Sequence, residues 1–138
     1  MNAFVVTGPN KPGELARLTD ELAHRGVNIT GFSSATCGDI GTAYLLTNDE
    51  SATRSALTSG KWTYNEIEVV AAQLASAPGS LHEASERLGR AGVNIEGAIA
   101  TGMSGNNITV AFITNNPARA REALGTAVLV GHSGGSNR

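Results

Sequence analysis

Hydrophobic residues follow two different spacings in the first part of the chain, and each spacing predicts a different element. Residues 3–7 are β-branched or apolar and stop at Gly8-Pro9, which is typical of a strand that ends in a turn. Between residues 14 and 25, apolar residues recur at i, i+3 and i+7 among charged residues, namely at Leu15, Leu18 and Leu22. This stripe predicts a helix that packs on a sheet, and Gly26 is expected to cap its C-terminus in the left-handed conformation.

The residues that follow complete a unit of four strands and two helices. Three further strands are predicted at residues 27–36, 42–47 and 62–67. A hairpin turn is expected near residues 38–41. Asn48 and Asp49 are residue types that cap helices, and they precede a weaker helix that runs through Leu57. The order β-α-β-β-α-β is the split βαβ arrangement of ferredoxin-like folds.

The chain repeats this unit. The segment from Pro12 to Gly31 recurs as Pro78 to Gly97, and nine of the twenty aligned positions are identical. The identical pairs are Pro12/Pro78, Gly13/Gly79, Leu15/Leu81, Leu22/Leu88, Gly26/Gly92, Val27/Val93, Asn28/Asn94, Ile29/Ile95 and Gly31/Gly97. A match this dense predicts two copies of one structural unit.

The second copy has the same predicted elements. They are strands at 69–74, 93–101, 108–114 and 127–130, and helices at 80–91 and 117–124. Asn116, Pro117 and Gly125 suit the N-cap, the first turn and the C-terminal end of the last helix. The turn at 103–107 is expected to hold one residue more than its counterpart, because later elements align at a spacing of 67 instead of 66.

These patterns predict two small domains, at residues 1–67 and 68–132, followed by a disordered, polar tail at 133–138. No Pro- or Ser-rich linker separates the domains, because Ile67 and Val69 nearly join two predicted strands. Units of about 65 residues bury little core alone. The short junction therefore favours pairing of the two units within the chain.

Composition and charge exclude several classes of function. The 138 residues are 41% hydrophobic but only 4% aromatic, which indicates a globular protein with an aliphatic core. The net charge is −2 and the sequence pI is about 5.9, with no basic run, so nucleic acid and membranes are not expected partners. The sequence shows neither a signal-peptide pattern nor a run of 18 apolar residues. We therefore expect a soluble, cytoplasmic protein.

Patterns that would indicate catalysis or metal binding are weak. Cys37 is the single cysteine, which excludes an internal disulfide and a cysteine-rich metal site. His24, His82 and His132 are scattered, with no second ligand at helical spacing. No nucleophile motif, phosphate-binding loop or general acid–base pair is identifiable. We expect no catalytic residue, no metal and no cofactor.

The start of the first helix has the chemistry of a ligand site. Gly13 lets a ligand approach the backbone closely, and the first N–H groups of the helix are unsatisfied donors that suit a carboxylate. Asn10 and Asn28 offer both donors and acceptors, and Leu15 and Ile29 could form an apolar wall. The alternative is a purely structural role, in which Pro12-Gly13 only makes a strand-to-helix turn and Asn28 only caps or hydrogen-bonds nearby backbone groups.

The motifs themselves resemble a known family. Asn-Lys-Pro-Gly-x-Leu at residues 10–15 and Gly-Val-Asn-Ile at residues 26–29 are similar to motifs of ACT domains, which are small-molecule-binding regulatory modules. The resemblance covers both repeats. It implies an α+β protein with two ferredoxin-like βαββαβ modules, paired as an internal pseudo-dimer with antiparallel sheets. The layout, without an enzyme domain, resembles the stand-alone tandem ACT proteins described as amino-acid-binding.

The resemblance also implies two related clefts, each formed by the helix entry of one module and the second strand of the other. One would be formed by Asn10, Lys11, Pro12, Gly13 and Leu15 with Asn94 and Ile95. The other would be formed by Ser76, Ala77, Pro78, Gly79 and Leu81 with Asn28 and Ile29. Ser76 stands where the first copy has Asn10 and offers fewer donors, so the first cleft is the favoured site.

The sequence leaves two main hypotheses on function. The first is a non-catalytic regulatory or sensor protein that binds a free amino acid between its modules, with possible allosteric coupling and an unknown regulated partner. The second is a protein-interaction or assembly module that uses the same fold without a small ligand. A homodimer is expected in either case, since small symmetric dimers are the common outcome. An unrecognised enzyme on this scaffold is the third and weakest alternative.

Overall fold

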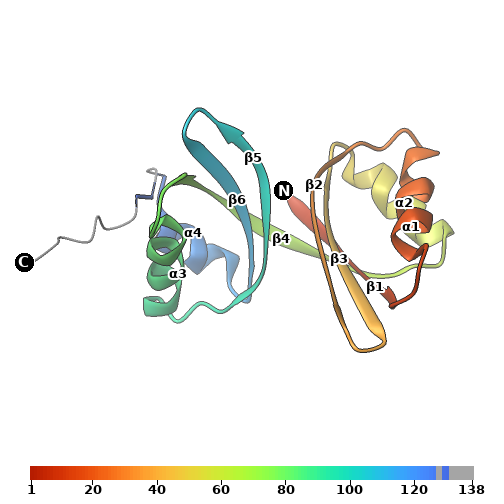
Figure 1. Ribbon diagram of the computed structural model, residues 1–138, viewed down its shortest axis with the longest axis horizontal. Coiled ribbons are helices and arrows are strands. Elements are labelled where there is room, and N and C mark those ends of the chain that lie inside the picture. Colours follow the sequence, from red (N-terminus) through yellow and green to blue (C-terminus); the bar gives the residue numbers. More distant parts are fainter. Residues whose placement is uncertain (127–128, 131–138) are drawn as a thin grey trace, which may run out of the picture. The chain divides into compact units, whose positions relative to one another are not determined.

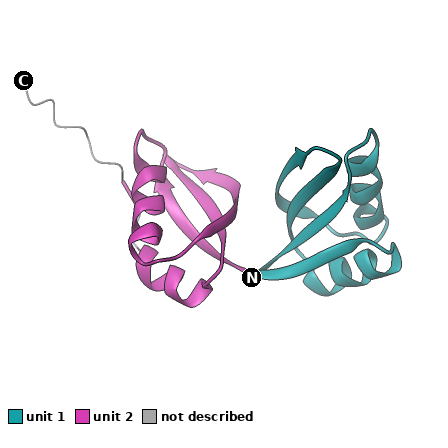
Figure 2. Ribbon diagram, turned by 90° about the horizontal axis from the view of Figure 1, so that it is seen from below, with its two compact units in different colours: residues 1–67 teal, residues 68–138 magenta. Residues whose placement is uncertain are grey.

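A computed structural model describes residues 1–126, 129 and 130 of the chain. It divides into two compact units, Met1–Ile67 and Glu68–Arg138, which Figure 2 shows in different colours. None of the helices in these described residues is long and apolar enough to cross a membrane.

The first unit has two helices on one face of a sheet (Figure 1). In chain order its elements are β1 (Asn2–Pro9), α1 (Glu14–Ala23), β2 (Ile29–Cys37), β3 (Ile40–Thr47), α2 (Glu50–Ser59) and the first part of β4 (Thr63–Ala75). The strands lie in the order β2-β3-β1-β4, and β3 pairs antiparallel with both β1 and β2. The predicted βαββαβ order is confirmed for this unit.

The core of the first unit lies between the helices and the sheet. The sheet contributes Phe4, Val6, Ala43 and Leu45, and the helices contribute Leu18, Leu22, Ala56 and Leu57. Leu22 is completely buried, as its place in the apolar stripe of α1 predicts. Side chains of a strand alternate between faces, so the even positions of β1 point toward the helices.

Glycine ends α1 as predicted. Gly26 has φ 68°, and the N–H of Val27 donates to the carbonyl of Leu22 over 3.1 Å. This six-residue closure is the Schellman arrangement, in which glycine takes the left-handed position. The second unit repeats it, with Gly92 at φ 71° and a 2.9 Å bond from Val93 to Leu88.

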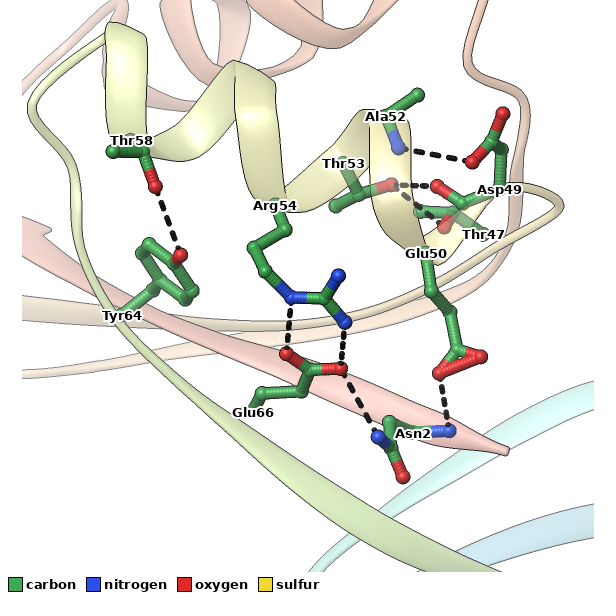
Figure 3. Close-up of polar contacts among 10 residues, drawn as sticks. All are labelled: Asn2, Thr47, Asp49, Glu50, Ala52, Thr53, Arg54, Thr58, Tyr64 and Glu66. Atoms are coloured by element: carbon green, nitrogen blue, oxygen red, sulfur yellow. Dashed lines mark hydrogen bonds and ion pairs between the residues drawn. The ribbon is translucent and has the colours of Figure 1, made fainter.

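A polar network joins α2 to the start of β1 and to β4 in the first unit (Figure 3). The guanidinium of Arg54 on α2 donates to both carboxylate oxygens of Glu66 on β4, over 2.8 and 2.6 Å. The amide of Asn2 donates to the same carboxylate over 3.0 Å, and the backbone N–H of Asn2 donates to Glu50. These bonds, from Arg54 first and Asn2 second, lower the pKa of Glu66 to about 2.

The second unit contains the rest of β4, α3 (Ser80–Arg90), β5 (Ile95–Ser104), β6 (Asn107–Thr114) and α4 (Pro117–Leu124). Its strands lie in the order β4-β6-β5, and both pairings are antiparallel. The core is aliphatic apart from Phe112, and its larger members are Leu74, Leu88, Val110, Leu124 and Leu129. Asn116 caps α4 as predicted, by accepting the N–H of Arg119 over 3.1 Å.

The extra residue of the second copy is not in the turn at 103–107, so that prediction is wrong. Both hairpins have the same two-residue turn, Gly38-Asp39 between paired Cys37 and Ile40, and Gly105-Asn106 between paired Ser104 and Asn107. The register of β5 instead shifts between Ala100 and Gly102, where Thr101 is inserted as a β-bulge. A bulge absorbs one residue in an edge strand and leaves the turn unchanged.

The predicted last strand at 127–130 is described only in part. Residues 127 and 128, like the predicted tail at 133–138, lie outside the described residues. Leu129 forms a single parallel bridge with Leu74, and its N–H donates to the carbonyl of Gln73 over 3.0 Å. Leu129 is 2% exposed, so burial of its side chain in the core fixes this bridge.

Two glycines that were interpreted as turn residues lie within strands. β1 does not stop at Gly8-Pro9 but continues through Pro9, and Gly41 belongs to β3 and not to the hairpin turn. Gly8 and Gly41 are cross-strand partners in the antiparallel pair of β1 and β3. Glycine weakens a strand, because it has no side chain to pack.

Candidate functional site

The helix entry is built in the same way in both units. Gly13 and Gly79 are the N-cap residues of α1 and α3, with φ 88° and 89°, and neither cap has a side chain that accepts a hydrogen bond. Only glycine adopts this conformation without strain. The Pro-Gly pairs therefore make the strand-to-helix turns, as the structural alternative requires, and also leave the first turn of each helix without a side-chain cap.

Asn10 holds the helix-entry loop against the β2–β3 hairpin. Its side-chain amide donates to the carbonyl of Gly38 over 2.9 Å, and its backbone N–H donates to Asp39 over 2.8 Å. Ser76, at the equivalent position, repeats only the backbone bond, to Asn106 over 2.7 Å. Asn10 thus has a structural contact that Ser76 lacks, and its contact with a ligand stays a prediction.

Asn28 and Asn94 have their backbone groups satisfied by other asparagines. The N–H of Asn28 donates to the side-chain oxygen of Asn48 over 2.9 Å, and Asn94 donates to Asn115 in the same way over 2.9 Å. The cap role expected for Asn48 is wrong, because Asp49 is the residue that caps α2. The side chains of Asn28 and Asn94 are exposed. Whether they contact a ligand stays a prediction.

A pocket of about 210 Å³ lies in the first unit, between α1 and the helix-facing side of the sheet. Of the predicted site residues it is lined by Asn10, Lys11 and Leu15. Pro12, Gly13, Asn28 and Ile29 are not among its lining residues. Sequence reasoning missed the other residues that shape it, which include Gly8, Glu14, Ser34, Thr36, Gly41 and Trp62. Only the register of the sheet brings these positions together.

Charges of both signs border this pocket. The carboxylate of Glu14, whose side chain is only 16% exposed, lies 3.2 Å from Arg17 and 3.7 Å from the ammonium of Lys11. The hydrogen bond from Arg17 is the main cause of the lowered pKa of Glu14, and the charges of Arg17 and Lys11 add to it. Glu14 therefore remains ionised at neutral pH, and the pocket lining presents this anion beside the cation of Lys11.

Trp62 forms an aromatic wall of the pocket. The guanidinium of Arg17 lies 3.9 Å from the centre of its ring, a cation–π contact that fixes Arg17 beside Glu14. The indole nitrogen is buried and has no hydrogen-bond partner among the described residues. Trp62 is the single tryptophan of the chain, and this is the one sequence feature that could have pointed to it as a site residue. The sequence pattern predicts only that it begins a strand.

The helix entry of the second unit has different chemistry. Ala77 and Ser80 stand where the first unit has Lys11 and Glu14. The hydroxyl of Ser80 is part-buried and donates to the carbonyls of Ala75 and Ala77 over 2.6 and 3.0 Å. Leu81, like Leu15, is an exposed apolar side chain beside the loop. The charge pair of the first unit therefore has no counterpart at these two positions.

The histidines and the cysteine that the structure describes are scattered over its surface. No group of three or more His, Cys, Asp or Glu side chains within them could hold a metal ion. His24 is exposed at the C-cap of α1, where a hydrogen bond to the backbone of Asp20 and the charge of its carboxylate raise the pKa of His24. His82 lies 3.7 Å from Glu86 on the surface of α3. Cys37 is exposed at the end of β2.

Comparison with solved structures identifies the fold. No protein-family model matches the sequence, and no curated protein matches it. Protein BT0572 from Bacteroides thetaiotaomicron is similar with a TM-score of 0.77 and 24% identity, over 89% of this chain and 85% of that chain. The regulatory subunit of aspartate kinase from Thermus thermophilus is similar with a TM-score of 0.63 and 19% identity, over 89% of both chains.

The corresponding subunit from Thermus flavus has a TM-score of 0.61 and 18% identity, over 89% of this chain and 88% of that chain. These regulatory subunits have ACT-domain folds. The chain has the ACT-type fold. The α+β, ferredoxin-like class inferred from the repeated motifs is therefore confirmed. Because these structures are less than 25% identical to this chain, the similarity shows the fold alone. The roles of individual residues in this ACT-type protein are therefore argued from its own geometry.

Proposed function

We propose that this ACT-type protein is a non-catalytic regulatory protein that binds a free amino acid at the helix entry of its first unit. The observation that carries the proposal is the pocket of about 210 Å³ beside α1, with Lys11 and Glu14 as a pair of opposite charges among its lining residues. Binding pockets are typically apolar clefts with a few polar groups that fix the orientation of the ligand.

A free amino acid is a zwitterion, and the charged border suits both of its ends. The ammonium group would pair with the Glu14 carboxylate, which is shielded from water and ionised. The carboxylate would pair with Lys11 and the first N–H groups of α1, at the positive end of the helix dipole. An amide nitrogen carries two hydrogens, so Asn10 can keep its bond to Gly38 and still donate to the ligand.

The fold supports the regulatory part of the proposal. The two Thermus neighbours are regulatory subunits by name, and the proposal extends that role to this chain. The remaining predicted contacts belong to the same proposal: Asn94 and Ile95 for the first cleft, and the second cleft of Ser76, Ala77, Pro78, Gly79 and Leu81 with Asn28 and Ile29. The second cleft is the weaker candidate, because it lacks the charge pair.

Thermal unfolding against a panel of free amino acids at millimolar concentration tests this function. A ligand at a hundredfold over its Kd stabilises by about 2.7 kcal/mol, which raises the midpoint of a protein this small by several degrees. The shift should fall by at least about half in Glu14→Gln, which removes the charge that holds the ammonium and should weaken binding at least tenfold. Glu86→Gln removes a comparable charge from α3, where Glu86 pairs with Arg90, and should leave the shift unchanged.

Two results would contradict the proposal. The first is the absence of any shift for the wild-type protein, which would favour the assembly module that works without a small ligand. The second is a shift that Glu14→Gln retains in full, because the ligand would then bind away from the helix entry of the first unit.

A further inference from the structure

We infer that the first unit holds a pocket for the aliphatic side chain of the bound amino acid, and that Gly8 and Gly41 open it. This inference rests on the proposed function and names its ligand class: amino acids of the size of valine, leucine, isoleucine or methionine. The side chain would enter between α1 and the sheet, while the ammonium and carboxylate groups stay at the charged border beside Glu14 and Lys11.

The backbone does not require glycine at either position. Neither Gly8 nor Gly41 has a positive φ, and each lies within a regular antiparallel ladder as the direct partner of the other. A Cβ at position 8 would lie 3.7 Å from the Glu14 carboxylate and 3.8 Å from the Trp62 ring, which is ordinary contact. At position 41 the nearest atoms would be 3.7 and 3.8 Å away.

Glycine in a strand interior weakens the strand and often marks a place where a ligand approaches the backbone. Here both residues line the same pocket, and both face the helix side of the sheet with Val6 and Ala43. Because neither strain nor crowding accounts for the pair, the pocket that both glycines line is the feature that they share.

The second unit carries large side chains at the two equivalent positions. The equivalent cross-strand pair is Leu74 and Ile108, at the corresponding positions of β4 and β6. Leu74 is 2% exposed and belongs to the core, and Ile108 packs against the same core. The same two repeat positions therefore carry two large side chains in one unit and none in the other.

The walls and size of the pocket select the ligand class. Val6, Leu18, Ala43 and Trp62 provide apolar surface at the inner end of this open pocket. For scale, an enclosed apolar cavity of about 150 Å³ is known to hold benzene. A pocket of about 210 Å³ therefore has room for an aliphatic side chain of four carbons. Because leucine buries such a side chain and alanine does not, leucine should bind about tenfold to a hundredfold more tightly than alanine, a difference of about 1.4 to 2.8 kcal/mol in binding free energy.

Titration of the full chain with leucine, alanine and glycine, followed by the fluorescence of Trp62 and by calorimetry, tests the inference. Trp62 is the single tryptophan and lines the pocket, so its emission reports on occupancy directly. The variant Gly8→Leu introduces the residue of the second unit, and Gly41→Ile does the same on β3. Gly89→Ala on α3 is the matched control, since a Cβ there meets nothing within 4 Å.

The inference predicts that leucine binds the wild type and Gly89→Ala equally, and that Gly8→Leu and Gly41→Ile weaken leucine binding at least tenfold while glycine binding changes little. If these variants fail to fold, as circular dichroism would show, the preference of the wild type for leucine over alanine decides alone. Equal affinities for leucine, alanine and glycine would overturn the pocket and retain the proposed function. No binding of any amino acid to the wild type would overturn both.

Discussion

Replacing Gly8 by alanine should stabilise the fold, although it narrows the candidate site. Alanine loses less backbone entropy on folding than glycine, a gain of about 0.4 to 1 kcal/mol where the native conformation suits both residues. Gly8 lies in β1 without a positive φ, and the new methyl group would find its neighbours at 3.7 and 3.8 Å, so no strain opposes this gain. Partial burial of the methyl group adds up to about 0.8 kcal/mol.

We therefore expect Gly8→Ala to raise the free energy of unfolding by about 0.5 to 1.5 kcal/mol. Urea unfolding followed by circular dichroism measures this as a higher midpoint with an unchanged m value. Gly26→Ala is the matched comparison, because the same chemical change at φ 68° should cost about 1 to 2 kcal/mol. A loss of 1 kcal/mol or more in Gly8→Ala would refute the argument, since glycine would then be required by the strand itself.

Three further predictions follow from other parts of the first unit. Leu22→Ala should lower the free energy of unfolding by about 2 to 5 kcal/mol, because Leu22 is completely buried. A loss below about 1 kcal/mol in urea unfolding would contradict the assignment of Leu22 to the face of α1 that packs on the sheet. Glu66 stabilises the folded state fully above its ordinary pKa of 4.5, and this contribution is lost as the pH falls toward about 2. Glu66→Gln should therefore cost about 1 to 2 kcal/mol at pH 7, a value reduced for the exposure of Arg54, and much less near pH 2, where the folded-state carboxyl is about half protonated. An equal cost at both pH values would contradict the role of the charge. Asn10→Ala should cost about 0.5 to 1 kcal/mol through its lost bond to Gly38 and should abolish the response to amino acids, whereas an unfolded variant would point to a purely structural role.

The repeated sequence predicts most of the fold for clear physical reasons. The stripe of Leu15, Leu18 and Leu22 marks α1, although Leu15 itself is exposed at the edge of the stripe. Gly26 and Gly92 mark the helix ends, because only glycine suits their positive φ. These features are local, so a single stretch of sequence contains all the information that they need.

Features that depend on the register of the sheet were missed. The bulge at Thr101 and a longer turn shift the alignment of later elements by the same one residue, so the sequence alone does not separate them. Asn48 has a residue type that caps helices, and only the structure shows that it accepts the N–H of Asn28 instead.

The candidate site was predicted only in part for the same reason. Asn10, Lys11 and Leu15 follow one another along the loop and were found from its motif. Gly8 and Gly41 were interpreted as turn residues, since glycine after an apolar run is typical of turns. Their pairing across β1 and β3, and the pocket that it opens, exist only in three dimensions.

Calorimetric titration of the wild-type chain with a free aliphatic amino acid tests the central claim most directly. The account predicts about one ligand per chain, because the pair of Lys11 and Glu14 beside an open pocket belongs to the first unit, while Ala77 and Ser80 stand in the second. It also predicts that Glu14→Gln binds at least tenfold more weakly. An absence of heat for every amino acid, or two equivalent sites per chain, would contradict the account.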